Sequence, residues 1–383
     1  MDSSGLIVVG SGPAGVSAAE AFREHNSHDP VRILTDDPDL PYERPPLSKE
    51  FLRGEAERSD AELHPAQWFR DKNIELISTT GVDEIDRTQR FVAAAGERYP
   101  YQSLVLACGA KPRPFPVPGG EKALQLRSLA DATTLRGAAA RADSAVVIGA
   151  GFIGCEAAAS LALRGVTTTL VAPDPIPQAK RLGDDAGSRI VRFLNDAGVR
   201  FVGSTAVSSL SDGAVHLEDG GVIDCELILA ATGVAPQSTL ASDAGITVSD
   251  GRIVVDAGLR TSAENIYAAG DVAYAHNLTA GRPIAVEHWQ DAMDQGAIAG
   301  AAATGQAGQW DSVPGFWTTI GEETLKYHAW GDGFDRAHFA GHDGGFTVWY
   351  EKDGAAVGVL THNADDDYDR GEELIQRHRP IPR

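Results

Sequence analysis

Apolar and polar positions follow each other along the chain in an order that occurs twice. Residues 5–9 form a short apolar run, a glycine-rich turn follows at 10–15, and an Ala-rich stretch over 16–24 has the composition of a helix. A second apolar run at 31–34 completes this first block. Apolar runs joined by a turn and a helix predict a strand–helix–strand unit, whose two strands lie parallel in one sheet.

The same order returns in the middle of the chain. Its predicted strand, glycine turn, helix and strand occupy 145–148, 149–154, 155–164 and 166–171, respectively. Each copy is followed by an apolar run that ends in small residues, at 104–109 and at 227–233. The chain therefore reads as one architecture used twice, with the second copy inserted into the first.

The pattern changes after residue 311. Residues 346–350 and 357–360 predict a hairpin with its turn at Asp353-Gly354, followed by a charged helix. The run Asp365-Asp366-Asp367 lacks the spacing of a calcium loop, so we interpret it as a solvated turn. The expected fold class is α/β, with two Rossmann-like dinucleotide-binding domains, the second inserted in the first, and a small α+β C-terminal domain. The expected boundaries are 1–112 with 236–311 for the first domain, 113–235 for the second and 312–383 for the third.

Charge narrows the range of partners. The 383 residues include 33 basic and 54 acidic side chains, which gives a formal net charge of −21. Nucleic acids and anionic membrane surfaces attract basic proteins, so neither is expected as a partner. The first residues lack the basic segment of a signal peptide, and no apolar run reaches about 18 residues, so a cytoplasmic protein is expected.

Three cysteines, Cys108, Cys155 and Cys225, are widely separated in the sequence. This spacing argues against a disulfide scaffold, a four-cysteine iron–sulfur site and a closely spaced redox pair. The histidines likewise show no metal-ligand spacing, so no metal site is expected.

The first glycine turn, Gly10-Ser11-Gly12-Pro13-Ala14-Gly15, has the spacing of a dinucleotide-binding loop. Gly10 permits the tight turn, Gly12 lets the backbone approach a pyrophosphate, and Gly15 lets helix and strand pack closely. The phosphates are expected at the helix N-terminus, whose unpaired N–H groups favour anions. Asp37 follows the second strand, where an acid accepts the hydroxyls of an adenosine ribose.

The second turn, Gly149-Ala150-Gly151-Phe152-Ile153-Gly154, implies a second dinucleotide. We expect one to be a tightly held FAD and the other an exchangeable NADH or NADPH. The position that should carry the ribose-binding acid is Ala172. Asp174 could replace that acid, or Lys180 and Arg181 could bind a 2′-phosphate, so NADH is favoured only slightly.

A third motif, residues 266–272, is a strand that delivers Asp271 at the tight turn made by Gly270. In flavoproteins with two dinucleotide sites, such an aspartate hydrogen-bonds the ribitol chain of FAD. The alternative is an ordinary surface turn.

These motifs resemble, in order and spacing, the FAD-dependent, NAD(P)H-using ferredoxin reductases of bacterial oxygenase systems. That family includes putidaredoxin reductase and biphenyl dioxygenase reductase, with apoptosis-inducing factor as a more distant relative. The resemblance is carried by residues 41–49, 149–156, 267–271, 287–289 and 314–317.

The resemblance implies roles for individual residues. Arg44 and Lys49 are expected beside the flavin, Lys49 near its N5 edge, and Glu156 near the nicotinamide. Trp317 is expected to cover the flavin ring. Lys49, Glu156 and Trp317 are therefore the candidate catalytic residues, although a structural ion pair and plain core packing are the alternative interpretations. The other expected cofactor-binding positions are Val82, Gly109, Gly233, and Glu287-His288-Trp289, whose backbone should face the pyrimidine end of the isoalloxazine.

Together these features predict a flavoprotein that takes hydride from NAD(P)H onto FAD and passes single electrons to a ferredoxin-type iron–sulfur carrier. The protein is expected to be a monomer or homodimer. Residues 318–320 read Thr-Thr-Ile where the family usually has Ser, an acid and Gln, which leaves the acceptor open. The alternatives are an NAD(P)H oxidase or quinone reductase, and a redox-sensing FAD protein that binds a partner.

Overall fold

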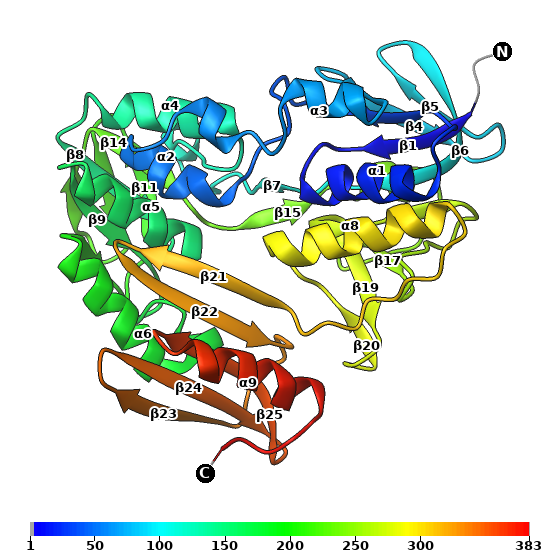
Figure 1. The fold of residues 1–383 in the computed structure, drawn as a ribbon. Helices are drawn as coiled ribbons and strands as arrows, with labels where there is room; N and C mark the ends of the chain where they lie inside the picture. The colour runs from blue at the N-terminus through cyan, green and yellow to red at the C-terminus, as the bar shows by residue number, and fades with distance from the viewer. Residues whose placement is uncertain (1–3, 383) are drawn as a thin grey trace. The chain divides into compact units, whose positions relative to one another are not determined.

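The computed structural model describes residues 4–382 and divides into two compact units, each assembled from three segments (Figure 1). Unit 1 contains Met1–Glu43, Glu62–Lys111 and Ala235–Pro314. Unit 2 contains Arg44–Ala61, Pro112–Val234 and Gly315–Arg383. Each unit contains one of the two glycine turns.

Unit 1 is built on a sheet whose central strands are parallel. β1 (Gly5–Val9) lies between β2 (Val31–Leu34) and β6 (Glu97–Leu106), with β3 (Ile74–Ile77) beyond β2. β18 (Ile266–Ala268) pairs with the end of β6, although it lies far away in the sequence. The five residues of β1 are all buried, as expected for a strand covered on both faces.

Two helices of unit 1 lie side by side, α1 (Pro13–His25) and α8 (Trp289–Ala303) (Figure 1). Their close approach depends on glycine. A Cβ atom on Gly296 would lie 2.2 Å from the carbonyl oxygen of Ala14, and one on Gly300 would lie 2.0 Å from that of Ala18. Real Cβ atoms do not come this close, so the two helix backbones touch without intervening side chains.

The remaining elements of unit 1 are antiparallel additions to this frame. β4 (Val82–Asp86) and β5 (Phe91–Ala94) extend the first half of β6, and a second sheet has the order β16-β17-β19-β20. The bounds of the latter strands and the other elements are β16 (Val248–Ser249), β17 (Arg252–Val255), β19 (Ala273–Asn277), β20 (Arg282–Ile284), α3 (Ala66–Asp71), α7 (Thr239–Asp243) and η4 (Gly270–Val272).

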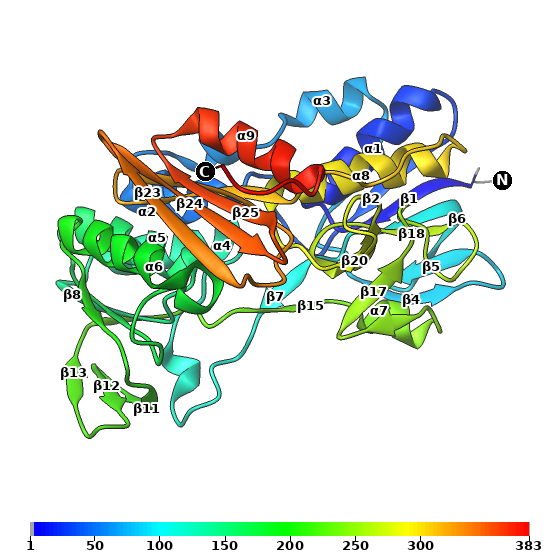
Figure 2. The same cartoon turned by 90° about the horizontal axis from the view of Figure 1, so that it is seen from below.

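Unit 2 repeats the strand–helix–strand pattern. β8 (Ser144–Ile148) lies between β9 (Thr167–Val171) and β14 (Leu227–Ala230), with β10 (Arg200–Val202) beyond β9, and all these pairs are parallel. The helices are η1 (Pro45–Ser48), α2 (Glu50–Arg53), η2 (Arg58–Ala61), η3 (Gly120–Lys122), α4 (Leu129–Ala139), α5 (Phe152–Leu163) and α6 (Ala179–Asp196). Figure 2 shows a separate three-stranded sheet of β11 (Val207–Ser211), β12 (Ala214–Leu217) and β13 (Val222–Asp224).

The end of the chain forms an antiparallel sheet in unit 2, in the order β21-β22-β25-β24-β23. Its strands are β21 (Gly315–Ile320), β22 (Glu323–Ala329), β23 (Arg336–His342), β24 (Gly345–Lys352) and β25 (Ala355–His362), and α9 (Asp365–Gln376) packs on β25 and β22. The hairpin predicted around Asp353-Gly354 is present as β24 and β25. Two short strands, β7 (Ala110–Pro112) and β15 (Val234–Pro236), lie where the chain passes between the units.

A shared hydrophobic core explains why unit 2 collects distant segments. Leu52 of α2, Val147 of β8, Leu161 of α5, Ile320 of β21 and Leu360 of β25 are buried in one cluster. Residues 44–61 and 315–383 therefore group with the second glycine turn, whereas the predicted boundaries put residues 44–61 with the first.

The prediction of a solvated turn at 365–367 is wrong. These three aspartates form the first turn of α9, where free N–H groups and the helix dipole favour acidic side chains. Asp365 also pairs with Lys326 at 2.7 Å, and Asp367 accepts a hydrogen bond of 2.6 Å from the hydroxyl of Thr347. Within residues 4–382, no helix combines the length and the apolar character needed to cross a membrane.

The contact between α1 and α8 predicts the effect of Gly300→Ala. Alanine normally favours a helix over glycine by up to about 1 kcal/mol, but its Cβ would overlap the Ala18 carbonyl. We therefore expect a loss of about 1–3 kcal/mol in the free energy of unfolding, measured in urea. Gly137→Ala in α4 is the control, because the nearest atom to its Cβ is the flexible end of Arg141 at 3.9 Å. Equal stability of the two variants would contradict the packing described.

Candidate active site

The first glycine turn in unit 1 is closed as tightly as its sequence predicts. Gly10 has φ +104°, and a Cβ there would lie 2.3 Å from the carbonyl oxygen of Ala107. A Cβ on Gly15 would lie 2.0 Å from the carbonyl oxygen of Gly10. Gly12 precedes α1, Pro13 is its first residue and Ala14 follows in the first turn. The first N–H groups of a helix have no partner inside it, so this end can receive a phosphate.

Asp37 is connected to this turn by hydrogen bonds. The hydroxyl of Ser11 donates to Oγ1 of Thr35 at 3.0 Å, and that oxygen also accepts the Asp37 N–H at 3.2 Å. Oδ2 of Asp37 accepts a bond of 2.8 Å from the hydroxyl of Tyr42. The carboxylate is therefore oriented at the end of β2, as a ribose-binding acid requires. Val82 begins β4 directly after Gly81, whose Cβ position lies 3.8 Å from Cβ of Asp36.

The Gly270–Asp271 turn lies against the first turn of α1. Gly270 has φ +77°, and a Cβ there would lie 3.1 Å from Cβ of Ala14. Its N–H donates to Oε1 of Gln295 at 2.9 Å, and Gln295 is buried on α8. The structure thus brings the first and third motifs together. The turn, the acid and Asp271 fit the phosphates, ribose and polyol chain of one dinucleotide.

The other predicted positions of unit 1 lie at element ends. Gly109 has φ +63° after β6, and its carbonyl accepts the N–H of Gln237. Glu287 forms an ion pair with Arg252. His288 is the N-cap residue of α8, and its Nδ1 lies 3.2 Å from Oδ2 of Asp291, while Trp289 begins the helix.

The second glycine turn, in unit 2, repeats the geometry of the first. Gly149 has φ +102°, with a Cβ position 2.4 Å from the Ala231 carbonyl oxygen, and a Cβ on Gly154 would lie 1.9 Å from the Gly149 carbonyl oxygen. Gly151 is different, because within 4 Å its Cβ would meet only Nε2 of Gln178, at 3.9 Å. That amide nitrogen donates to the carbonyl of Ala150 at 3.1 Å. The space above Gly151 is open to a ligand.

The ribose end of this second site carries both signs of charge. Ala172 is buried after β9 and provides no carboxylate. Asp174 and Lys180 form an ion pair at 2.9 Å, and the guanidinium of Arg181 lies 5.9 Å from the ring centroid of Phe152. Ile153 is exposed on the first turn of α5, and Gly233 follows β14 with φ +98°.

The central cluster of unit 2 is a buried ion pair between Lys49 and Glu156. Nζ of Lys49 lies 3.1 Å from Oε2 of Glu156, and the two residues are 6% and 3% exposed. Ser48 donates to the same oxygen at 2.5 Å, and Thr318 donates to Oε1 at 2.7 Å. Among the residues that the structure describes, Glu156 is the one partner recorded for the Lys49 ammonium, which leaves N–H donors for a ligand.

Local sequence explains how this cluster forms. Pro45 and Pro46 fix the first residues of η1, so that Lys49 lies between η1 and α2. Ser160 lies one turn after Glu156 on α5, and its hydroxyl donates to the carbonyl of Ser48 at 2.7 Å. Polar residues four apart lie on one face of a helix, so this face of the Ala-rich α5 holds the 48–49 segment.

Trp317 lies next to this cluster in sequence, but its side chain is exposed rather than buried with it. Successive side chains of a strand face opposite sides, so Thr318 is buried while Trp317 is 46% exposed. The ring of Phe316 packs on that of Phe152 with centroids 4.7 Å apart. Trp317 is thus an exposed aromatic surface on a strand attached to α5. Arg44 precedes η1 and is half-buried.

Sequence reasoning missed the hydroxyl and amide groups that orient these residues. The motifs give no individual role to Ser48, Ser160, Tyr42 or Gln178, and Thr318 is marked only by its departure from the family pattern. The spacing of Glu156 and Ser160 in an otherwise apolar helix was the available signal for one of them.

Comparison with known proteins identifies the family. Residues 4–296 match the family model of the Pyridine nucleotide-disulphide oxidoreductase family. The chain belongs to this family. Rhodocoxin reductase of Rhodococcus erythropolis is 34% identical, over 98% of this chain and 90% of that protein.

Solved structures of similar fold support the same family assignment. A ferredoxin reductase for the CYP199A2 system from Rhodopseudomonas palustris has a TM-score of 0.94 and 30% identity, covering 99% of this chain and 96% of that one. Putidaredoxin reductase in a covalent complex with putidaredoxin has a TM-score of 0.94 and 29% identity, covering 99% and 94%. The predicted resemblance to ferredoxin reductases is therefore confirmed, as are an oxidoreductase activity and the use of FAD with NAD(P)H.

Despite the family name, the cysteines of this family member are unsuited to disulfide chemistry. All three are free. Burial raises the pKa of the Cys108 thiol to about 12 and that of Cys225 to about 11, and it raises the pKa of Cys155 as well. Since the thiolate is the reactive form, burial disfavours thiol chemistry at these positions.

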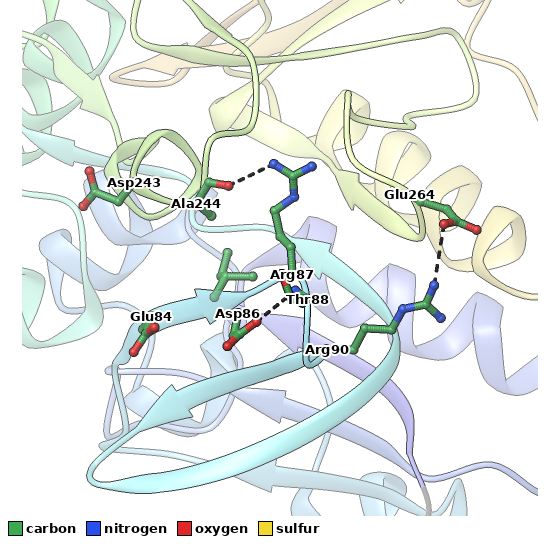
Figure 3. A pocket seen from close by; sticks show the side chains of 9 residues that line it. Glu84, Asp86, Arg87, Thr88, Arg90, Asp243, Ala244 and Glu264 are labelled. Carbon is green, nitrogen blue, oxygen red and sulfur yellow. Dashed lines mark hydrogen bonds and ion pairs between the residues drawn. The ribbon is translucent and has the colours of Figure 1, made fainter.

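A surface pocket of about 510 Å³ in unit 1 has none of the predicted site residues in its lining (Figure 3). Charged side chains line it, and its two arginines bond to neighbouring groups. Arg87 donates to the carbonyl oxygens of Ala244 and Gly245 at 3.1 and 3.0 Å, and Arg90 lies 3.6 Å from Glu264. Within residues 4–382, no three His, Cys, Asp or Glu residues are grouped so as to hold a metal ion.

The open space above Gly151 predicts a selective effect of Gly151→Val. Its φ of −70° suits any residue, so the unfolding midpoint should stay close to that of the unchanged protein. The added side chain occupies the approach of a pyrophosphate, and we expect NAD(P)H affinity to fall about tenfold, about 1.4 kcal/mol. Gly154→Ala is the contrasting variant, since its Cβ overlaps the Gly149 carbonyl and should lower stability. Unaltered coenzyme affinity in Gly151→Val would rule out this turn as the binding site.

Proposed function

We propose that this protein takes hydride from NAD(P)H and passes single electrons to a ferredoxin-type iron–sulfur carrier. The observation that carries the proposal is the buried Lys49 ammonium, whose recorded partner is Glu156 on the helix of the second glycine turn. A purely structural ion pair does not explain why the buried Lys49 ammonium keeps N–H groups that are not bonded to the protein. The names of the relatives, rhodocoxin reductase and a putidaredoxin reductase bound to putidaredoxin, support the same acceptor class.

When bound, NAD(P)H supplies a hydride, and FAD accepts it and releases electrons one at a time. The protein contributes position and charge. Lys49 offers a positive charge and N–H donors where negative charge develops, and Glu156 holds its side chain in place. We assign Trp317 to covering the ring system and excluding water. The three cysteines are free rather than paired, so we propose that electrons leave without a thiol relay.

Specific roles follow for the parts of the chain. We propose that residues 1–112 and 236–311 bind FAD, mainly through the Gly10–Gly15 turn, Asp37 and Asp271. Residues 113–235 bind the pyridine nucleotide through the Gly149–Gly154 turn. Residues 312–383 provide the surface that meets the carrier. The protein is proposed to act as a monomer or homodimer.

Two departures from the family pattern bear on donor and acceptor. Thr318 keeps a hydroxyl where the family has Ser, but Thr319 bonds to Thr324 at 3.0 Å and Ile320 is fully buried. The acid is thus replaced by a neutral hydroxyl and the amide by a buried apolar side chain, which favours a carrier recognised with less charge. Asp174 is available to a ribose only if its pair with Lys180 opens, so we expect little discrimination between NADH and NADPH.

Anaerobic stopped-flow absorbance tests the proposal on the FAD-loaded protein. We expect NADH and NADPH each to bleach the flavin band near 450 nm within seconds. Subsequent turnover with excess cytochrome c should rise at least about tenfold when a [2Fe–2S] ferredoxin or a rubredoxin is added, because the carrier relays single electrons.

Three other outcomes would contradict the proposal. Absence of bleaching with both coenzymes would exclude a pyridine nucleotide reductase. Fast aerobic or quinone turnover without gain from any carrier would indicate an oxidase or quinone reductase. Slow reoxidation by every acceptor, with a persistent long-wavelength absorption band, would indicate a redox-sensing protein.

A further inference from the structure

Thr318 makes a contact that no motif assigns to it. Its Oγ1 donates to Oε1 of Glu156 at 2.7 Å, and both side chains are almost completely buried. The two residues come from β21 and α5, which pack against each other. This bond is therefore a tertiary contact in the interior of unit 2.

The hydrogen bonds to Glu156 are divided between its two oxygens. Oε2 receives Ser48 at 2.5 Å and Lys49 at 3.1 Å, whereas Oε1 receives Thr318. No other donor to Oε1 is recorded among residues 4–382. A buried carboxylate oxygen without a donor costs free energy. Loss of the Thr318 bond would therefore make the carboxylate turn toward another donor of the cluster. Ser48 has a single O–H, which it already donates to Oε2, so the neighbouring donor with unused hydrogens is the Lys49 ammonium, which would then be drawn onto both oxygens.

The same bond fixes the strand that carries Trp317. Because Thr318 faces inward, its neighbour Trp317 faces outward and is 46% exposed. Pairing with β22 sets the register of β21 and puts Trp317 opposite Lys326. This pairing does not by itself attach β21 to α5. The contacts that do so near the cluster are the Thr318–Glu156 bond and the packing of Phe316 on Phe152.

We propose that Thr318 is a positioning residue for the transfer of hydride from NAD(P)H. It holds Glu156 so that Lys49 makes one bond to the carboxylate and keeps its other N–H donors for the flavin. The inference rests on the proposed function, since it assigns Lys49 to the flavin. A purely structural role for Thr318 is the competing explanation.

The test compares three variants at one strand. Thr318→Val removes the hydroxyl while keeping the shape, and Thr318→Ser keeps the hydroxyl. Thr319→Val is the matched control, because Thr319 follows Thr318 on β21 and the variant loses the bond to Thr324 of β22 without touching Glu156. Thr318→Ala removes the hydroxyl with a smaller side chain and replaces Thr318→Val if the latter does not fold.

Rapid-reaction kinetics should separate positioning from binding. In Thr318→Val we expect the limiting rate of flavin reduction to fall about tenfold, the effect of one lost buried hydrogen bond. The coenzyme concentration for half-maximal rate should change less than about twofold, and Thr318→Ser and Thr319→Val should keep both parameters within about twofold. A second readout is independent of turnover. The midpoint potential of the bound flavin should shift in Thr318→Val and not in Thr319→Val.

A double-mutant cycle of Thr318→Val with Glu156→Gln, measured by urea unfolding, tests the bond itself. Coupling is expected, since contacting residues are not additive. Coupling in stability with an unchanged limiting rate and potential would overturn the positioning role and leave the proposed function intact. Absence of coupling would also overturn it. Failure of both coenzymes to reduce the unmodified protein would overturn the proposed function and this role together.

Discussion

The buried ion pair between Lys49 and Glu156 is the interaction on which the account depends. Removing one partner of such a pair typically costs about 3–5 kcal/mol, because the other charge is left uncompensated in the interior. Here Ser48 and Thr318 share the task of satisfying the carboxylate, so three separate segments meet at one side chain. The arrangement satisfies the carboxylate with three donors and, at the same time, presents a cation with unused N–H groups. That combination fits the role beside the flavin that we propose for Lys49.

Backbone geometry provides the second constraint. Gly10 and Gly149 both have left-handed φ, and Gly15 and Gly154 leave no room for a Cβ atom, so each strand meets its helix at close range. The result is two helix N-termini with unpaired N–H groups, one in each unit, which matches two phosphate-bearing ligands. Gly151 differs from these glycines, because the space around its Cβ position is open, and we infer that a ligand approaches the turn from that side. Glycines therefore have two separate roles within one turn. Gly149 and Gly154 allow the close packing of strand and helix, and Gly151 leaves space for a ligand.

Local periodicity was sufficient to predict the two strand–helix–strand blocks, the hairpin at Asp353-Gly354 and the separation of the two dinucleotide turns. It could not predict that residues 44–61 join the second unit, because that grouping depends on Leu52 packing beside Val147 and Ile320 in a shared core. Spacing alone also gave no reason to select Thr318. Its hydroxyl meets Glu156 only through the contact of β21 with α5, a tertiary fact. The spacing of the acidic run at 365–367 excludes a calcium loop, but it does not reveal that the run lies within the first turn of α9, where the helix dipole favours carboxylates.

The central claim is that Lys49 places a positive charge beside the flavin and that Glu156 moderates it. The most direct measurement is the midpoint potential of the bound flavin in Lys49→Met and in Glu156→Gln, each compared with the unmodified protein at one pH. A nearby cation stabilises a reduced, negatively charged group, so the potential should become more negative in Lys49→Met and more positive in Glu156→Gln. Unchanged potentials, or shifts of the same sign in both variants, would contradict the account.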